Sequence, residues 1–129
     1  MLDYALSLSH HIPQEWRSLD DLGAEILSGN PQQRERLDYG SLETPMMVGV
    51  WECTQGSFKL TYTFNELATI LEGRVTIAFP DGSSHDFGPG DTHFAQKGDT
   101  ATWTIHTEKV RKSFFIYTGD QVESTAAAQ

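Results

Sequence analysis

The sequence predicts an all-β protein, built as a sandwich or a barrel of short strands. Apolar and polar residues alternate along residues 58–64 and again along residues 74–79, which is the period-two pattern of a half-buried strand. Glycine and proline, at 11 and 5 residues, separate the short apolar runs with turn signals. About six to eight short strands at nearly regular spacing are typical of a sandwich or barrel, and not of a sheet with helical crossovers.

The core domain is predicted to cover residues 46–118, and its elements follow one another with short connections. Strands are expected at residues 58–64, 74–79, 102–106 and 113–117, with turns at 70–73, 80–82 and 88–91. Cys53 lies in an apolar run that resembles a packed strand, so we expect an inert buried thiol.

Two flanking segments are predicted to lie outside this core. Residues 1–45 are polar and mixed, and we expect an N-terminal arm that lies on the barrel or on a partner subunit. Within the arm, Ser18 is a candidate N-cap for a short helix that includes Ile26 and Leu27, and Gly29 would end it. Residues 119–129 have nothing to bury, which predicts a flexible C-terminal tail.

Charge and composition exclude several classes of function. The chain has 9 Lys and Arg against 18 Asp and Glu, a formal net charge of −9, and no basic stripe for nucleic acid. No stretch approaches the roughly 20 apolar residues of a membrane span, and the N-terminus does not resemble a signal peptide. The single cysteine cannot form an intramolecular disulfide. We therefore expect a soluble, cytoplasmic protein that binds neither nucleic acid nor membrane.

Two spaced motifs carry a resemblance to a known family. Gly56 is followed after five residues by Tyr62-x-Phe64, then by Glu66, and after six more residues by Gly73. Further on, Gly90 is followed after five residues by Gln96-x-Gly98, two residues and Ala101. This spacing resembles the two motifs of the cupins, with a shorter gap before the glutamate. The resemblance implies a cupin-type double-stranded β-helix, or jelly-roll barrel.

The same resemblance bears on metal binding. Most cupins place metal-binding histidines where this sequence has Tyr62, Phe64 and Ala101, and only Glu66 remains of the usual ligands. A divalent transition metal needs about three or four nitrogen, oxygen or sulfur donors at once. We therefore expect no cofactor, and no Mn, Fe, Ni or Zn at the usual place.

A finer resemblance covers roughly residues 38–118. The order and spacing of several short elements, from residues 49–56 to residues 110–112, resemble the ureidoglycine aminohydrolase-like branch of small cupins. Some members of that branch are metal enzymes of ureide catabolism, and others have no assigned reaction. The resemblance implies a small nitrogen-containing metabolite as the ligand.

Strand periodicity predicts which side chains face the barrel interior. If Glu66 points inward, then Tyr62, Phe64 and Ala68 share its face because alternate residues of a strand point to one side. The same argument on later strands points His93, Ala95, Ala101, Trp103 and Ile105 inward. The predicted cavity is aromatic and apolar with one carboxylate, one phenol and one imidazole, which is typical of a small-molecule site.

These residues are the candidates for function. Glu66, with His93 or Tyr62, is the candidate for acid–base catalysis. Phe64, Trp103 and Lys112 are candidates for contact with a ligand. Each could instead serve only to pack or close the barrel. Lys112 shares the parity of the core residues around it, so it could enter the cavity and pair with Glu66 or Glu72, or extend to solvent.

Three hypotheses about function follow. The leading one is a small-molecule-binding cupin that acts without metal, with or without catalysis by Glu66. The alternatives are a metal-dependent aminohydrolase-like enzyme and a non-catalytic metabolite sensor or assembly partner. A homodimer is expected, because the polar arm and the open strand edges of a small barrel need a partner surface.

Overall fold

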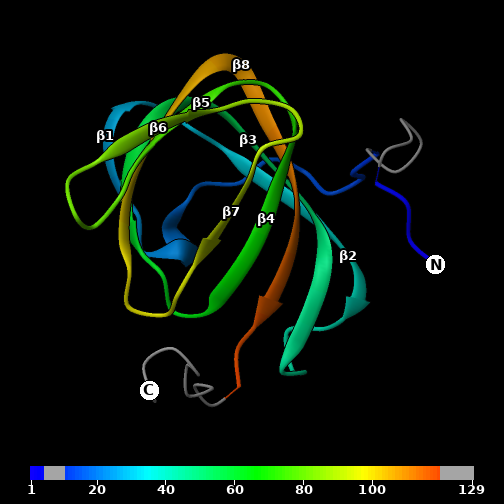
Figure 1. The fold of residues 1–129 in the computed structure, drawn as a ribbon. Coiled ribbons are helices and arrows are strands. Elements are labelled where there is room, and N and C mark those ends of the chain that lie inside the picture. The colour runs from blue at the N-terminus through cyan, green and yellow to red at the C-terminus, as the bar shows by residue number, and fades with distance from the viewer. Residues whose placement is uncertain (5–10, 120–129) are drawn as a thin grey trace, which may run out of the picture.

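Two long strands organise the molecule. The computed structural model describes residues 1–4 and 11–119, so the predicted tail at residues 119–129 lies outside them except for its first residue. Strand β3 (Met46–Thr61) pairs antiparallel with β8 (Thr100–Tyr117) from Met46↔Tyr117 to Thr61↔Thr100. The pairing has one irregularity, between Thr54 and Gly56, and there the long ladder turns from one sheet into the other (Figure 1).

The other strands pair on the two halves of this ladder. Around the Met46 end, the order is β2–β3–β8–β4–β7, and around the Thr61 end it is β1–β3–β8–β5–β6. We call these sheet I and sheet II. Their further strands are β1 (Glu25–Gly29), β2 (Gln33–Gly40), β4 (Asn65–Glu72), β5 (Val75–Ala78), β6 (Ser84–Phe87) and β7 (Thr92–Ala95).

The core lies between the two sheets. Alternate side chains of each strand face inward, and the buried cluster is largely aromatic and β-branched, with Trp51, Phe58, Trp103 and Phe114 among its larger members. Because the pairing is irregular near Gly56, inward residues of β3 are odd-numbered before it and even-numbered after it. The predicted all-β class and jelly-roll architecture are confirmed.

One glycine shows how tightly the strands are connected. Gly73, between β4 and β5, has φ 89°, and a Cβ built there would lie 2.3 Å from the carbonyl oxygen of Lys109. Only glycine accepts both the backbone angle and the close approach. The turn at Gly73 begins later in the chain than the predicted turn at 70–73, because Ile70 and Leu71 still belong to β4.

The N-terminal helix prediction is wrong. In the part of the arm that the structure describes, the helical element is one 3-10 turn, η2 (Asp20–Leu22), which ends at Gly23 in the left-handed region. Ile26 and Leu27 lie instead in β1, where Glu25 and Ile26 pair with Lys59 and Phe58. Residues 25–40 of the expected arm thus extend both sheets, because free edges of β3 accept them. Within the described residues, no helix is long and apolar enough to cross a membrane.

Candidate functional site

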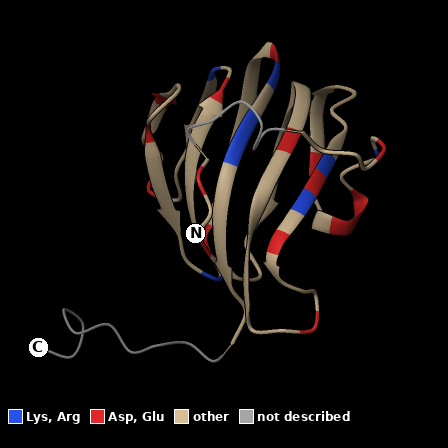
Figure 2. Ribbon diagram, turned by 90° about the vertical axis from the view of Figure 1, so that its right-hand side faces the viewer, with Lys and Arg blue, Asp and Glu red and all other residues tan. Residues whose placement is uncertain are grey.

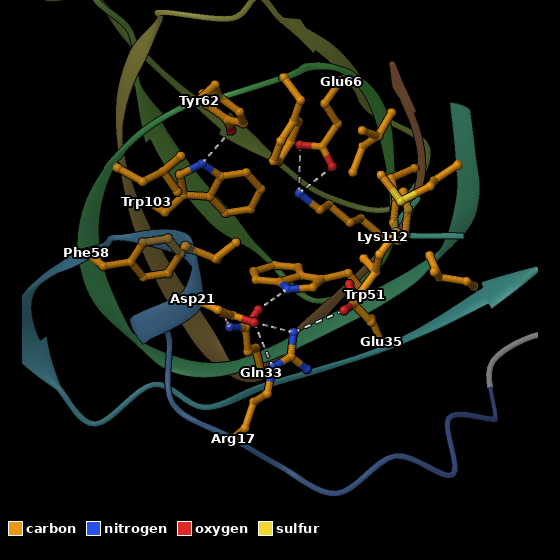
Figure 3. A pocket seen from close by; sticks show the side chains of 18 residues that line it. Arg17, Asp21, Gln33, Glu35, Trp51, Phe58, Tyr62, Glu66, Trp103 and Lys112 are labelled. Atoms are coloured by element: carbon orange, nitrogen blue, oxygen red, sulfur yellow. Dashed lines mark hydrogen bonds and ion pairs between the residues drawn. The ribbon is translucent and has the colours of Figure 1, made fainter. Parts of the chain in front are cut away.

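A cavity of about 340 Å³ opens between the sheets, on the side of the N-terminal segment. Its walls combine aromatic side chains with aliphatic ones from β2, β3 and β8. The aromatic members are Trp51, Phe58, Tyr62, Phe64, Trp103 and Phe114. The polar lining residues are few, and Figure 3 shows how they divide into a pair inside the cavity and a cluster beside Trp51.

The pair inside the cavity is Lys112 and Glu66. Lys112 Nζ lies 3.1 Å from both carboxylate oxygens of Glu66, and the two residues are 6% and 2% exposed. Lys112 lies opposite Ile70 on β4, so its long stem reaches back along that strand to Glu66 (Figure 3). Of the partners that the sequence left open for Lys112, the structure selects Glu66.

Two tryptophan rings enclose the ammonium group. Lys112 Nζ lies 4.5 Å from the ring centroid of Trp51 and 4.7 Å from that of Trp103. The two rings meet edge to face, with centroids 5.8 Å apart, and Phe58 stacks on Trp103. Because the negative faces of aromatic rings attract a cation, they stabilise the charge of Lys112 away from water.

Tyr62 adds a hydroxyl to the same wall. Its oxygen accepts a hydrogen bond of 3.2 Å from Trp103 Nε1, and its ring packs edge to face on Phe64. Burial raises the pKa of Tyr62 well above its usual value, and the Glu66 charge adds to that shift. Tyr62 is therefore a proton donor in the cavity and not a phenolate.

The cluster beside Trp51 was not predicted. Trp51 Nε1 donates a 2.9 Å hydrogen bond to Gln33, and Gln33 in turn donates to the Ser18 carbonyl and to Asp21. Arg17 bridges Asp21 and Glu35 at 3.0 Å each. The cluster thus ties η2 and β2 to the ring that encloses Lys112. The sequence carried no signal for Gln33, which is one polar residue in a polar arm.

His93 faces a different space. It lines a recess of about 510 Å³ with Phe87 and Ala101, and its ring packs edge to face on Phe87 and Trp103. Its Nε2 is buried and has no hydrogen-bond partner among the described residues. Burial, with the Lys112 charge, lowers the pKa of His93 to about 4. The structure therefore joins Glu66 with Lys112, not with His93, although Tyr62 borders both spaces.

The donor set of the cavity does not fit a transition metal. In the described part of the chain, no three histidine, cysteine, aspartate or glutamate side chains converge on one point. At the usual cupin position Glu66 is the only carboxylate, and Lys112 occupies both of its oxygens. An ammonium group there would repel a cation, so no chemical step is assigned to a metal.

The other basic residues of β8, Lys109 and Arg111, form ion pairs on the face of sheet I that points away from the cavity. Buried Glu52 accepts from Arg34 at 2.7 Å, Lys109 at 3.0 Å and Arg111 at 2.6 Å. Burial alone would raise the pKa of Glu52, but the bonds from Arg34 and Lys109 and the charge of Arg111 hold it below its usual value. This network is structural and lies away from the cavity.

The fold and the aromatic cavity between its sheets define a cupin. A family model described as the EutQ-like cupin domain matches residues 41–114. The chain belongs to the EutQ-like cupin domain family.

Three solved structures illustrate the likeness. EutQ of Clostridium difficile is 20% identical, with a TM-score of 0.58 over 70% of this chain and 71% of that one. A Pseudomonas syringae protein of unknown function is 30% identical, with a TM-score of 0.60 over 70% and 39%. The polyketide cyclase RemF from Streptomyces resistomycificus is 17% identical, with a TM-score of 0.56 over 88% and 89%. No curated protein matches the chain.

Proposed function

We propose that this cupin binds a small molecule in the cavity between its sheets, without a metal. The polar groups that meet the ligand are Lys112, Glu66 and Tyr62, and the walls are Trp51, Trp103 and Phe64. The resemblance of residues 38–118 to the ureidoglycine aminohydrolase-like branch supports a small nitrogen-containing ligand.

One observation carries the proposal: the buried ion pair of Lys112 and Glu66, with 3.1 Å between its atoms, lies in the wall of a largely aromatic and apolar cavity. A buried ion pair adds little to stability, and apolar residues of similar size often stabilise the same place better. A ligand that uses the pair gives it a role that packing does not. The cavity volume of about 340 Å³ lies in the range of ligand pockets.

Any proton transfer in this proposal belongs to Glu66 and Tyr62, which border the cavity together. Glu66 offers an acceptor and Tyr62 a donor, which is the arrangement for moving a proton onto or off one bound molecule. His93 contributes to the wall behind Trp103 and has no part in that step. Within residues 1–4 and 11–119, no group of three histidine, cysteine, aspartate or glutamate side chains supports the metal-dependent alternative.

The experiment uses N-phenyl-1-naphthylamine, an uncharged probe that becomes fluorescent in apolar cavities. We expect saturable binding to the wild-type protein and its loss in Leu60→Trp, because Leu60 lines the cavity and the indole would fill it. The matched control is Leu67→Trp, on the outer face of β4, which should bind as the wild type does.

Two results would contradict the proposal. One is a fluorescence increase that does not saturate, and the other is equal binding by Leu60→Trp and Leu67→Trp. Circular dichroism of both variants checks that the substitutions leave the fold intact.

A further inference from the structure

The Lys112–Glu66 pair has unused hydrogen-bonding capacity on both partners. An ammonium group has three N–H donors, and two of those of Lys112 are taken by the two oxygens of Glu66. Each carboxylate oxygen can accept more than one hydrogen bond, and no other described residue donates to Glu66. The pair can therefore give one bond to a ligand and accept another from it.

The pair also sets the charge that a ligand can carry. Its two charges cancel at 3.1 Å, and the surrounding walls are apolar and aromatic. A charged ligand would bring a third, unneutralised charge into this space, which is unfavourable without a further partner. The second charged cluster, Arg17 with Asp21 and Glu35, carries one excess negative charge, but its side chains are 28–54% exposed, so water screens that charge. The deciding charges are therefore those of the buried pair. An uncharged ligand is favoured.

Tyr62 supplies a second donor to the same space. Its oxygen accepts from Trp103, and its own hydroxyl proton has no acceptor among the described residues. The cavity thus presents two donors, from Lys112 and Tyr62, and one acceptor, from Glu66. A carbonyl oxygen next to an N–H group complements that set.

We propose, resting on the proposed function, that the ligand is an uncharged, planar molecule with adjacent C=O and N–H groups, such as a lactam or a cyclic amide. Its carbonyl accepts from Lys112, and its N–H donates to Glu66. Its ring lies among Trp51, Trp103 and Phe64, and the volume of about 340 Å³ admits a body of one or two rings.

The test compares four probes of similar size by displacement of N-phenyl-1-naphthylamine. They are 2-quinolinone, N-methyl-2-quinolinone, 2-naphthoate and 2-naphthylmethylammonium. We expect 2-quinolinone to bind at least tenfold more tightly than each of the other three. In the double variant Lys112→Met/Glu66→Leu, its advantage over the N-methyl probe should disappear.

Several outcomes separate the two proposals. Tightest binding by either charged probe, or equal binding of the two quinolinones to the wild type, overturns the lactam inference. If the naphthylamine dye binds and no quinolinone displaces it, the cavity binds ligands but not this class. If the dye itself does not bind in the cavity, the result contradicts the proposed function, and with it the lactam inference.

Discussion

At the scale of single residues, the polar character of the cavity depends on the orientation of one side chain, that of Lys112. Lys109, Arg111 and Lys112 look alike in the sequence, but alternation sends Lys112 inward to Glu66, and Lys109 and Arg111 to the Glu52 network on the other face. A lysine at this depth requires both its carboxylate and its aromatic neighbours.

Removal of one partner of the inner pair should cost more than removal of both. Lys112→Met leaves the Glu66 carboxylate buried alone, so we expect a loss of about 3–5 kcal/mol in the free energy of unfolding. The double variant Lys112→Met/Glu66→Leu removes both charges, and we expect it within about 1 kcal/mol of the wild type or more stable. Urea unfolding at pH 7 measures both values. A double variant as unstable as the single one would show that the pair stabilises the fold by itself.

His93 should make the protein sensitive to mild acid. Its pKa in the folded state is about 4, below the value of about 6.5 in the unfolded chain. As pH falls from about 6.5 to 4, the unfolded state takes up a proton that the folded state does not, so stability falls by at most about 3 kcal/mol. Above pH 6.5 both states are neutral, and this contribution does not change.

The check is His93→Phe, compared with His85→Phe at an exposed position. Urea unfolding at pH 7 and pH 5 should show a smaller pH dependence in His93→Phe than in His85→Phe. Equal pH dependence in both variants would contradict the assignment.

At the scale of elements, the sequence predicted the strands of the core better than those of the arm. Residues 58–61 of β3 and 100–106 of β8 alternate apolar and polar residues because one face is buried. Burial also alternates along β4, but apolar residues are adjacent at 67–68 and 70–71, so the sequence did not mark this strand. All of β1 is exposed, and β2 carries Arg34 and Arg36 outward, where Arg34 neutralises Glu52. Neither segment has the alternation that identifies a strand.

Counting alternate residues predicts which side chains face the cavity only up to a register shift, because the inward face changes parity there. Tyr62, Glu66 and Trp103 were placed correctly because they follow the irregularity near Gly56 or lie on another strand. Trp51 precedes the irregularity, so counting back from Tyr62 puts it on the wrong face. The structure places His93 apart from Glu66: both face inward, but Glu66 pairs with Lys112, and His93 packs on Phe87 and Trp103.

Gln33 connects the N-terminal segment to the wall of the cavity through hydrogen bonds. It is 0% exposed, and its amide bonds Trp51, Ser18 and Asp21. Gln33→Met keeps the size but leaves Trp51 Nε1 without an acceptor, so we expect a loss of about 1–3 kcal/mol and a shift of tryptophan emission. Gln96→Met, at an exposed position, is the control and should change neither. An unchanged emission spectrum in Gln33→Met would mean that Trp51 does not depend on this contact.

At the scale of the whole molecule, the Glu52 network joins β2, β3, β4 and β8. Figure 2 shows basic and acidic segments on neighbouring strands of the barrel. Because the folded-state pKa of Glu52 lies below its ordinary value, its contribution is present above about pH 4.3 and is lost as pH falls further.

We therefore expect Glu52→Gln to be less stable than the wild type at pH 7, by about 3 kcal/mol, because Arg34, Lys109 and Arg111 lose their shared anion. Its stability should also change less between pH 5 and pH 3. Thermal unfolding at these pH values is the measurement, with the exposed Glu108→Gln as the control. A parallel decline of Glu52→Gln and the wild type in acid would contradict this account.

The long ladder of β3 and β8 also constrains the order of events during synthesis. β1 and β2 are made before β3, which is their strand partner among the described residues, and β3, β4 and β5 all pair with β8. Neither sheet can close until Thr100–Tyr117 has emerged. A chain that terminates before residue 100 can pair β1 and β2 with β3, β4 with β7, and β5 with β6. It lacks the strand that joins these pairs, so its apolar segments stay exposed until late in translation.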